Sequence, residues 1–280
     1  MQPGKPSRTA FGAAVHRAAH QVLEGGAIFT DPLAVRILGP DGPAAIHAAE
    51  QDPSRRRMRL FIAVRTRFAE DALAAAVARG VRQLVVLGAG LDTFAYRTNL
   101  GPDLRVFEVD QPSTQAWKRQ RLAEVAIPIP DTLTFVAVDF ERETLAQRLS
   151  AAGFDPEQRT FFTWLGVVPY LEEATVLATL GFIASLPGGA HVVFDYGNPA
   201  APGDAGTGAD AARASLAARV AAVGEPFKSY YETDALRGQL LAAGFREVVD
   251  LGPGSIRERY FANRGNAPSD RGGHVVHAHT

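Results

Sequence analysis

The segment that most constrains the fold is residues 84–93, which read LVVLGAGLDT. A short apolar run that favours a β-strand breaks into Gly-x-Gly and then into a helix start. In open α/β sheets this order places a glycine turn at the carboxyl end of a strand, where nucleotide-like ligands bind. Gly88 permits the tight turn, and Gly90 lets the backbone approach a ligand closely. The pattern predicts a cofactor site but leaves the cofactor open, because many nucleotide-binding folds carry Gly-x-Gly.

The composition limits the kind of protein that this chain can be. Its 280 residues are 46% hydrophobic and 21% charged, with no cysteine and a formal net charge of −1. Such a chain can bury a sizeable core, and it has no overall charge that would attract nucleic acid or a membrane. The lack of cysteine excludes disulfides and thiolate metal sites. No apolar run is long enough for a signal or membrane segment, so we expect a cytoplasmic protein. We also expect that it has no metal and is a monomer or a homodimer.

Strand and helix patterns alternate after residue 75. We predict strands at residues 83–87, 105–110, 133–139, 160–165, 191–196, 246–251 and 256–261. We predict helices at residues 113–125, 141–152, 172–185 and 233–243. This alternation favours a mostly parallel seven-stranded sheet with helices on both faces, which places the chain in the α/β class.

The regions outside this core have different compositions. Residues 1–75 are rich in Ala and Arg and are predicted to form a helical cap, while residues 76–264 form the core. An insertion at about residues 197–230 is predicted to carry a helix at 210–223 and to serve with the cap as a lid. Residues 265–280 contain few apolar side chains, so we predict a disordered tail. Its histidines, His274, His277 and His279, could bind a metal adventitiously, but a solvated tail is the favoured interpretation.

Acidic residues stand where the second and third strands are predicted to end. Glu108 and Asp110 are two positions apart, so they share one face of their strand. They follow the glycine turn by roughly 20 residues, the spacing at which an acid binds ribose hydroxyls in such folds. Asp139 and Phe140 end the third strand, where a carboxylate can accept a hydrogen bond from an adenine amine and an aromatic ring can contact the base. Asp139 can equally cap the following helix.

The fourth strand leads into Gly166 and an aromatic turn. We expect this turn to separate the cofactor from a second substrate, the acceptor of the group that the cofactor carries. Side chains at strand ends or in the insertion are candidates to line an acceptor pocket, although ordinary packing explains each equally well: Tyr170, Tyr196, Asn198, Tyr230 and Tyr231. Thr93 stands where a dinucleotide motif would have its third glycine, which disfavours a nicotinamide cofactor. Spacing alone does not decide between a dinucleotide and S-adenosylmethionine (SAM).

Several segments in the same order resemble one known family. They are QLVVLGAGLDTFAYR at 83–97, FEVDQP at 107–112, VDF at 138–140 and GVVPYL at 166–171. From about Thr9 to Phe261 the chain resembles the leucine carboxyl methyltransferase family, especially its bacterial branch. The resemblance implies a Rossmann-like class I methyltransferase fold, SAM as the cofactor, S-adenosylhomocysteine as the product, and O-methylation that is often part of secondary metabolism.

The resemblance also implies roles for individual residues. The glycine turn would lie under the methionine and ribose parts of SAM, Asp110 would bind the ribose, and Arg65 would pair with the methionine carboxylate. Leu165 replaces an acid that helps to hold SAM in much of the family, so we expect a different polar contact there. The full set predicted at the cofactor is Arg65, Gly88, Ala89, Gly90, Glu108, Asp110, Asp139, Phe140 and Leu165.

Three functions remain open at this point. The chain resembles an O-methyltransferase for a carboxylate or hydroxyl of a small molecule, such as a polyketide-like or aromatic metabolite. A protein C-terminal carboxyl methyltransferase and a SAM-fold binding protein without turnover are the alternatives. A carboxylate acceptor needs no general base, whereas a phenol gains from one. His20 and His191 are candidates, but His191 begins its strand and is expected far from the cofactor end, so we predict catalysis mainly by positioning.

Overall fold

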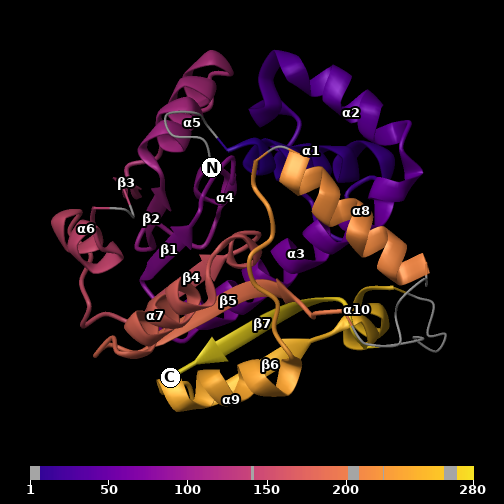
Figure 1. Cartoon of the computed structure of the whole chain (residues 1–280). Coiled ribbons are helices and arrows are strands. Elements are labelled where there is room, and N and C mark those ends of the chain that lie inside the picture. The colour runs from indigo at the N-terminus through magenta and orange to yellow at the C-terminus, as the bar shows by residue number, and fades with distance from the viewer. Residues whose placement is uncertain (1–6, 140–141, 201–207, 223, 262–269) are drawn as a thin grey trace.

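The seven strands form one sheet in the order β3-β2-β1-β4-β5-β7-β6 (Figure 1). The computed structural model describes residues 7–139, 142–200, 208–222, 224–261 and 270–280. The strands are β1 (Gln83–Leu87), β2 (Arg105–Asp110), β3 (Leu133–Ala137), β4 (Thr160–Trp164), β5 (Ala190–Gly197), β6 (Glu247–Leu251) and β7 (Gly273–His279). The pairs from β3 to β5 are parallel, and β7 is antiparallel to both of its neighbours. The predicted α/β class with a mostly parallel seven-stranded sheet is confirmed.

The strand order reverses at β1, and we call the carboxyl edge of the sheet at this reversal the crevice. From β1 the chain moves outward to β2 and β3, then returns past β1 to β4 and β5. Ligands of open α/β sheets bind at such a reversal, outside the carboxyl ends of the strands. The register pairs Val86 with Glu108 on one side and with Thr163 on the other. The turns that follow β1 and β4 and the end of β2 therefore meet at the same edge.

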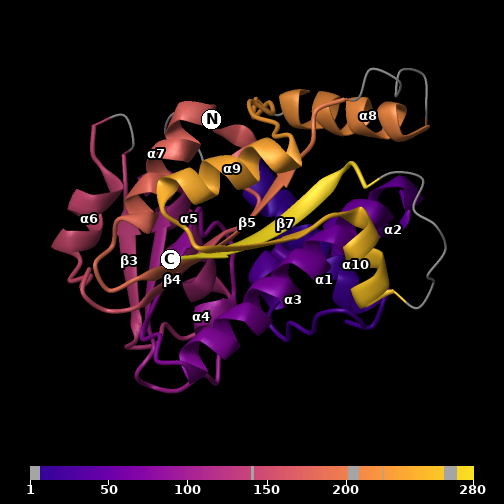
Figure 2. The same ribbon diagram turned by 90° about the horizontal axis from the view of Figure 1, so that it is seen from below.

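Helices cover both faces of the sheet (Figure 2). The helices α3 (Arg56–Ala78), α4 (Phe94–Arg97) and α10 (Pro253–Tyr260) lie on one face, and α6 (Leu145–Ala151), α7 (Glu173–Ala184) and α9 (Thr233–Ala243) lie on the other. On β1, Leu84 and Val86 pack into the cluster under α3, whereas Val85 and Leu87 pack into the cluster under α7. Side chains of a strand point alternately to its two faces, so this central strand is buried on both.

The N-terminal helices form a third apolar cluster with α5 (Pro112–Glu124). They are α1 (Arg8–Leu23) and α2 (Gly42–Glu50), joined to α3 through the 3₁₀ turns η1 (Arg36–Asp41) and η2 (Pro53–Arg55). A third turn, η3 (Val168–Tyr170), follows β4, and α8 (Gly208–Ala222) follows β5. Within the described ranges, no helix is long and apolar enough to cross a membrane.

The prediction of a disordered tail at residues 265–280 was wrong for its second half. Residues 273–279 form β7, which lies between β5 and β6 and pairs with both. Val275, Val276 and Ala278 are completely buried. These three small apolar side chains are enough because both edges of the strand are hydrogen-bonded and both of its faces are covered. Residues 265–269 lie outside the described residues.

The predicted last strand at residues 256–261 was also wrong. This segment belongs to α10, which begins with Pro253 at its first position and buries Ile256. Proline at the first turn of a helix is favourable because its fixed φ suits the helix and its missing N–H has no partner there. The helix predicted at 141–152 begins later, at Leu145, because Thr144 and Gln147 form a capping box.

Candidate functional site

The backbone after β1 makes the tight turn that the glycines predict. The N–H groups of Gly88 and Ala89 both donate to the Val109 carbonyl, at 2.9 and 3.1 Å, and so fix the turn to β2. Gly88 has a φ of 67°, and a Cβ at this position would lie 2.3 Å from Cγ2 of Val167. Only glycine fits here, because any side chain would be strained and would collide with the segment after β4.

Asp110 reaches this turn from the end of β2. Its Oδ2 accepts a hydrogen bond from the Gly90 N–H at 2.6 Å, and its Oδ1 accepts one from the Gln111 N–H at 2.7 Å. Burial raises the pKa of Asp110, while both backbone donors oppose the rise. Each carboxylate oxygen can accept a second hydrogen bond. Asp110 therefore lies where the prediction placed the ribose acid, with acceptor capacity left for a ligand.

Glu108 lies on the same face of β2 but deeper in the protein. Its Oε2 is 2.6 Å from Nζ of Lys118 and accepts a hydrogen bond from the Tyr96 hydroxyl at 3.2 Å. Burial raises the pKa of Glu108 to about 7, against the opposing effect of Lys118. This internal pair does not favour direct contact with a ribose, so Asp110 is the acid of the two that the site presents.

Arg65, on α3, forms a buried ion pair with Asp195 on β5. Its Nη1 lies 2.8 Å from Oδ2 of Asp195, and the other carboxylate oxygen accepts the Gly166 N–H at 2.6 Å. Gly166 has a φ of 72°, and a Cβ there would lie 2.6 Å from Nη2 of Arg65. The guanidinium therefore lies directly against the turn after β4, at the crevice.

One donor of Arg65 has no partner. Among the described residues, its Nε is buried and lacks a hydrogen bond. Nε of Arg17 and of Arg121 is in the same state, so the missing partner points to a ligand because the guanidinium of Arg65 lies at the binding edge of the sheet. An anionic group bound there would provide that partner, and this fits the predicted role of Arg65 toward a carboxylate.

Asp195 was missed by the sequence analysis. It stands near the end of an apolar strand, as Asp110 does, so the rule that found Asp110 could have found it. Leu165 is the position where the resemblance led us to expect a substitute polar contact, and its side chain packs into the apolar cluster under α3. Asp195 supplies a carboxylate to the adjacent Gly166 instead.

The residues that follow the glycine turn are held by hydrogen bonds and ion pairs to the N-terminal helices and the segments that join them. Thr93 donates through its hydroxyl to Oδ2 of Asp31 at 2.6 Å. Arg97 is paired with Glu70 and lies 3.4 Å from Oδ1 of Asp31. Its guanidinium also lies 4.9 Å from the ring centre of Phe29. These contacts explain why the segment combines a threonine and an arginine with an upstream aspartate, and they lock the turn in place.

Glu225 holds the first turn of α1 beside the crevice. Its carboxylate accepts from the backbone N–H groups of Arg8 and Thr9, at 3.2 and 3.3 Å, and from the hydroxyls of Ser7 and Thr9. A carboxylate at a helix N-terminus satisfies free N–H groups and interacts favourably with the helix dipole. Ala10 of the same turn lies so near Gly90 that a Cβ on this glycine would be 2.9 Å from its Cβ. We call this arrangement the Glu225 clasp.

Tyr170 is the one acceptor-pocket candidate that lies at this place. Its hydroxyl hydrogen-bonds to the Thr9 side chain, and burial raises its pKa to about 12, with Arg65 acting in the opposite direction. The ring of Phe227 packs against it with centroids 5.2 Å apart, and Tyr230 packs edge-on against Phe227. Phe227 was not predicted, although it follows Glu225 in the motif GEPF.

The other pocket candidates lie elsewhere or on the surface. Tyr196 donates to Oδ2 of Asp250 at 2.7 Å, and Asn198 donates to the Tyr231 carbonyl at 3.0 Å. Tyr196 and Tyr231 pack edge-on inside the core, whereas Tyr230 is 40% exposed. Tyr196, Asn198 and Tyr231 therefore connect β5 to the segments around it. Asn198 also lines a pocket with Glu232, Thr233, Asp234, Asp270 and Arg271, away from the glycine turn.

The adenine side of the site is described in part. The Asp139 side chain is 42% exposed after β3, with Arg142 Nε 3.8 Å from its Oδ2. Phe140 lies outside the described residues. Neither base candidate lies at the crevice: His191 is the second residue of β5, at the opposite edge, and His20 is buried with Ile28 N–H and Glu24 as partners.

Comparison with known proteins identifies the family. The family model for leucine carboxyl methyltransferase matches residues 10–184. The chain belongs to the leucine carboxyl methyltransferase family. The matched range contains the glycine turn, Asp110, Arg65 and the segment after β4, whereas Asp195 and Glu225 lie beyond it.

Individual relatives agree with this assignment. A protein of Bacillus subtilis strain 168 named as a SAM-dependent methyltransferase, YktD, is 34% identical over 219 residues, which cover 76% of this chain and 70% of that protein. A Streptomyces avermitilis protein with the same kind of name is 31% identical over 87% of this chain and 96% of its own length. The prediction of a SAM-dependent methyltransferase family is confirmed.

Solved structures agree on the fold. A DUF574 family protein from Streptomyces avermitilis MA-4680 has a TM-score of 0.54 at 15% identity, covering 94% of this chain and 95% of that chain. A protein from Bordetella parapertussis has a TM-score of 0.51 at 13% identity, covering 100% and 99% of the two chains. At these identities the likeness concerns the arrangement of strands and helices only.

Proposed function

We propose that this protein is a SAM-dependent O-methyltransferase that acts on a carboxylate or hydroxyl of a small, flat molecule such as a polyketide-like or aromatic metabolite. The observation that carries the proposal is the orphaned Nε of Arg65, held beside the glycine turn by the ion pair with Asp195. A buried guanidinium that pairs with an aspartate through one nitrogen can still bind a second carboxylate through another. The methionine part of SAM carries such a carboxylate.

The residues present fit this cofactor at three points. Asp110 retains acceptor capacity for ribose hydroxyls, Gly88 permits the tight turn beside Asp110 and Val167, and Arg65 offers the cation for the methionine carboxylate. Asp139 is proposed at the adenine. When bound, SAM would supply an activated methyl group on a sulfonium sulfur, for an oxygen nucleophile to attack in line with the thioether leaving.

The chain contributes chiefly binding and orientation to this reaction. Holding two reactants in line lowers the barrier by several kcal/mol without any acid or base. The Glu225 clasp, Tyr170 and the Phe227 ring packed on it lie beside the glycine turn and can exclude water. Because burial raises the pKa of Tyr170 to about 12, this hydroxyl stays protonated at neutral pH and can donate a hydrogen bond to an acceptor oxygen. These features favour an acceptor that is already ionised, such as a carboxylate.

The proposal is tested with SAM carrying a labelled methyl group and three acceptor classes: aromatic carboxylic acids, phenols, and peptides that end in a leucine carboxylate. We expect label in the small acids, released as methanol by mild base because it is held as an ester. Label that resists base would place the acceptor among the phenols. Transfer to peptides alone would replace the proposal with protein carboxyl methylation, and SAM binding without any transfer would replace it with a binding role.

A further inference from the structure

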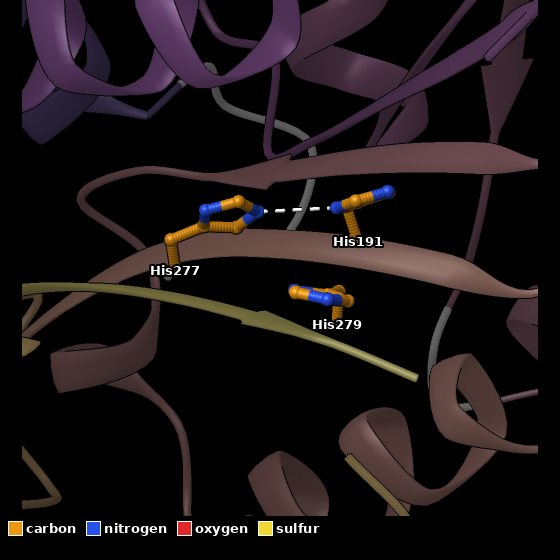
Figure 3. A group of neighbouring side chains, drawn as sticks. All are labelled: His191, His277 and His279. Atoms are coloured by element: carbon orange, nitrogen blue, oxygen red, sulfur yellow. Dashed lines mark hydrogen bonds between the residues drawn. The ribbon is translucent and has the colours of Figure 1, made fainter. Parts of the chain in front are cut away.

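Three histidines gather at the edge of the sheet opposite the glycine turn (Figure 3). His191 is near the start of β5, and the antiparallel register places it directly across from His279 at the end of β7. His277 precedes His279 by two positions, so both point to the same face of β7. Cross-strand and diagonal neighbours on one face of a sheet are close enough to interact. The pairing of β7 with β5 therefore creates a cluster that neither segment has alone.

The ring nitrogens have distances that suit a shared ligand. One nitrogen from each ring lies within 4.8 Å of the other two, and Nδ1 of His191 is 3.2 Å from Nε2 of His277. Two imidazoles on one tetrahedral Zn²⁺ have their nitrogens about 3.3 Å apart, because each Zn–N bond is about 2.0–2.1 Å. The contact between His191 and His277 is a hydrogen bond between rings whose planes differ by 25°, so an ion would replace this bond and the rings would turn toward it. The 32% exposed side chain of His279 permits this third ring to turn as well.

A carboxylate lies beside the third ring of the cluster. Oε2 of Glu247 is 3.6 Å from Nε2 of His279. A carboxylate at this place can orient a ligating ring or supply a fourth ligand.

Two features of the same edge oppose a cation. The charges of Arg79 and Arg159 lower the pKa of His191, and the same charges repel a metal ion. The Phe161 ring stacks on His191 with centroids 5.7 Å apart, which restricts its movement. We therefore expect weaker binding than at a closed structural zinc site.

We propose that His191, His277 and His279 bind one divalent transition-metal ion, for which Zn²⁺ is the probe, and that the ion links β5 to the C-terminal strand β7. Three imidazoles with one open position suit zinc and related ions. The site lies at the far edge of the sheet from Arg65 and Asp110, so it is independent of the proposed function. Its expected effect is on the stability of the C-terminal strand.

The first test follows the ¹⁵N resonances of the imidazole rings while the full wild-type chain is titrated with Zn²⁺. The chain has seven histidines, which gives four internal controls. We expect His191, His277 and His279 to shift together and to saturate at one equivalent. No shift in these three rings, or shifts spread over other histidines, would overturn the proposal. This experiment needs no variant.

The second test compares His191→Gln with His47→Gln, a control on a helix far from the cluster whose side chain is 70% exposed. Zinc affinity is measured against a chromophoric chelator, and thermal unfolding is measured with Zn²⁺ and with EDTA. We expect His191→Gln to bind Zn²⁺ more than about tenfold more weakly and to lose the zinc-dependent rise in Tm, while His47→Gln behaves as wild type. Equal affinity in the two variants would contradict the assignment.

Discussion

The two halves of the sheet treat their buried polar groups differently. Around β1, β2 and β4, Asp110 keeps free acceptor capacity and Arg65 keeps an unpartnered donor. In the half formed by β5, β7 and β6, Asp250 accepts from Tyr196 with one oxygen and contacts His274 Nδ1 with the other, at 2.7 and 2.6 Å. The contrast concerns these particular groups, because Oε1 of Gln239 on α9, in the second half, is also buried without a partner among the described residues. This difference separates a binding edge from a segment that secures the end of the chain.

The largest effect is expected from Arg65→Met. The substitution removes the cation proposed for the cofactor carboxylate and leaves Asp195 buried without its partner. Losing hydrogen bonds to a charged group weakens binding by about 1.5–3 kcal/mol, which is roughly 10- to 150-fold. Unpairing a buried aspartate lowers the free energy of unfolding by about 3–5 kcal/mol. The measurements are the KM for SAM and urea unfolding.

Arg67→Met is the matched control on the same helix, because Arg67 pairs with Asp71 at the surface. It should change neither quantity by more than about 0.5 kcal/mol. If Arg65→Met alters acceptor binding while the KM for SAM stays constant, Arg65 belongs to the acceptor and the assignment of the cation is wrong.

A second test removes one carboxylate from each half of the sheet and compares the effects on SAM binding and on stability. Asp110→Ala should weaken SAM binding by about 1–3 kcal/mol, because it removes an acceptor for the ribose and a contact of the Gly90 N–H. Asp250→Ala should leave SAM binding unchanged and lower the free energy of unfolding by a similar amount, because Tyr196 loses its carboxylate acceptor and Nδ1 of His274 loses its partner. Calorimetric titration and urea unfolding of both variants give the comparison. A larger loss of SAM affinity in Asp250→Ala would reverse our distinction between the halves.

A smaller effect is expected from Glu225→Gln. The amide still accepts one hydrogen bond but loses its charge at the N-terminus of α1, a change of about 1 kcal/mol. We expect faster proteolysis before residue 12 and a severalfold higher KM for SAM, because α1 then covers the glycine turn less of the time. Glu232→Gln serves as the control, since Glu232 pairs with Arg271 near the surface. Unchanged proteolysis would show that the clasp does not hold α1 in place.

The effect that is smallest at neutral pH, and grows as the pH falls, concerns His16. Burial, aided by Arg55, Arg59 and Arg65, lowers the pKa of His16 from 6.5 to about 4. Between these values the unfolded chain binds a proton that the folded protein does not, so this group costs stability as pH falls, by up to about 1.4 kcal/mol per pH unit. His16→Gln should therefore have a flatter fall in unfolding free energy from pH 6.5 to 4 than wild type. An identical slope in the two proteins would mean that His16 ionises normally in the folded state.

The half of the sheet with the crevice was the more predictable half. The bounds of β1 and β2 and the place of Asp110 at the glycine turn follow from local patterns: an apolar run, a turn that needs glycine, and an acid at a fixed spacing. Local signals of this kind lie within about 20 residues of one another, so few alternative local structures are compatible with them.

The contacts that sequence reasoning missed join distant segments. Arg65 and Asp195 are 130 residues apart, and Glu225 lies 216 residues beyond Thr9. The strand β7 carries too few apolar residues to predict a strand by itself, and its burial depends on β5 and β6 on either side. Glu108 was placed on the correct face, but its partner Lys118 comes from the next helix and turns it into an internal pair.

The central claim is that SAM binds at the carboxyl edge of β1, β2 and β4, and a crystal of the full chain soaked with S-adenosylhomocysteine tests it most directly. We predict density for the product over the glycine turn, with its ribose at Asp110 and its carboxylate at Arg65. Density at another place, or a crevice that takes up a nicotinamide dinucleotide and excludes S-adenosylhomocysteine, would contradict the account.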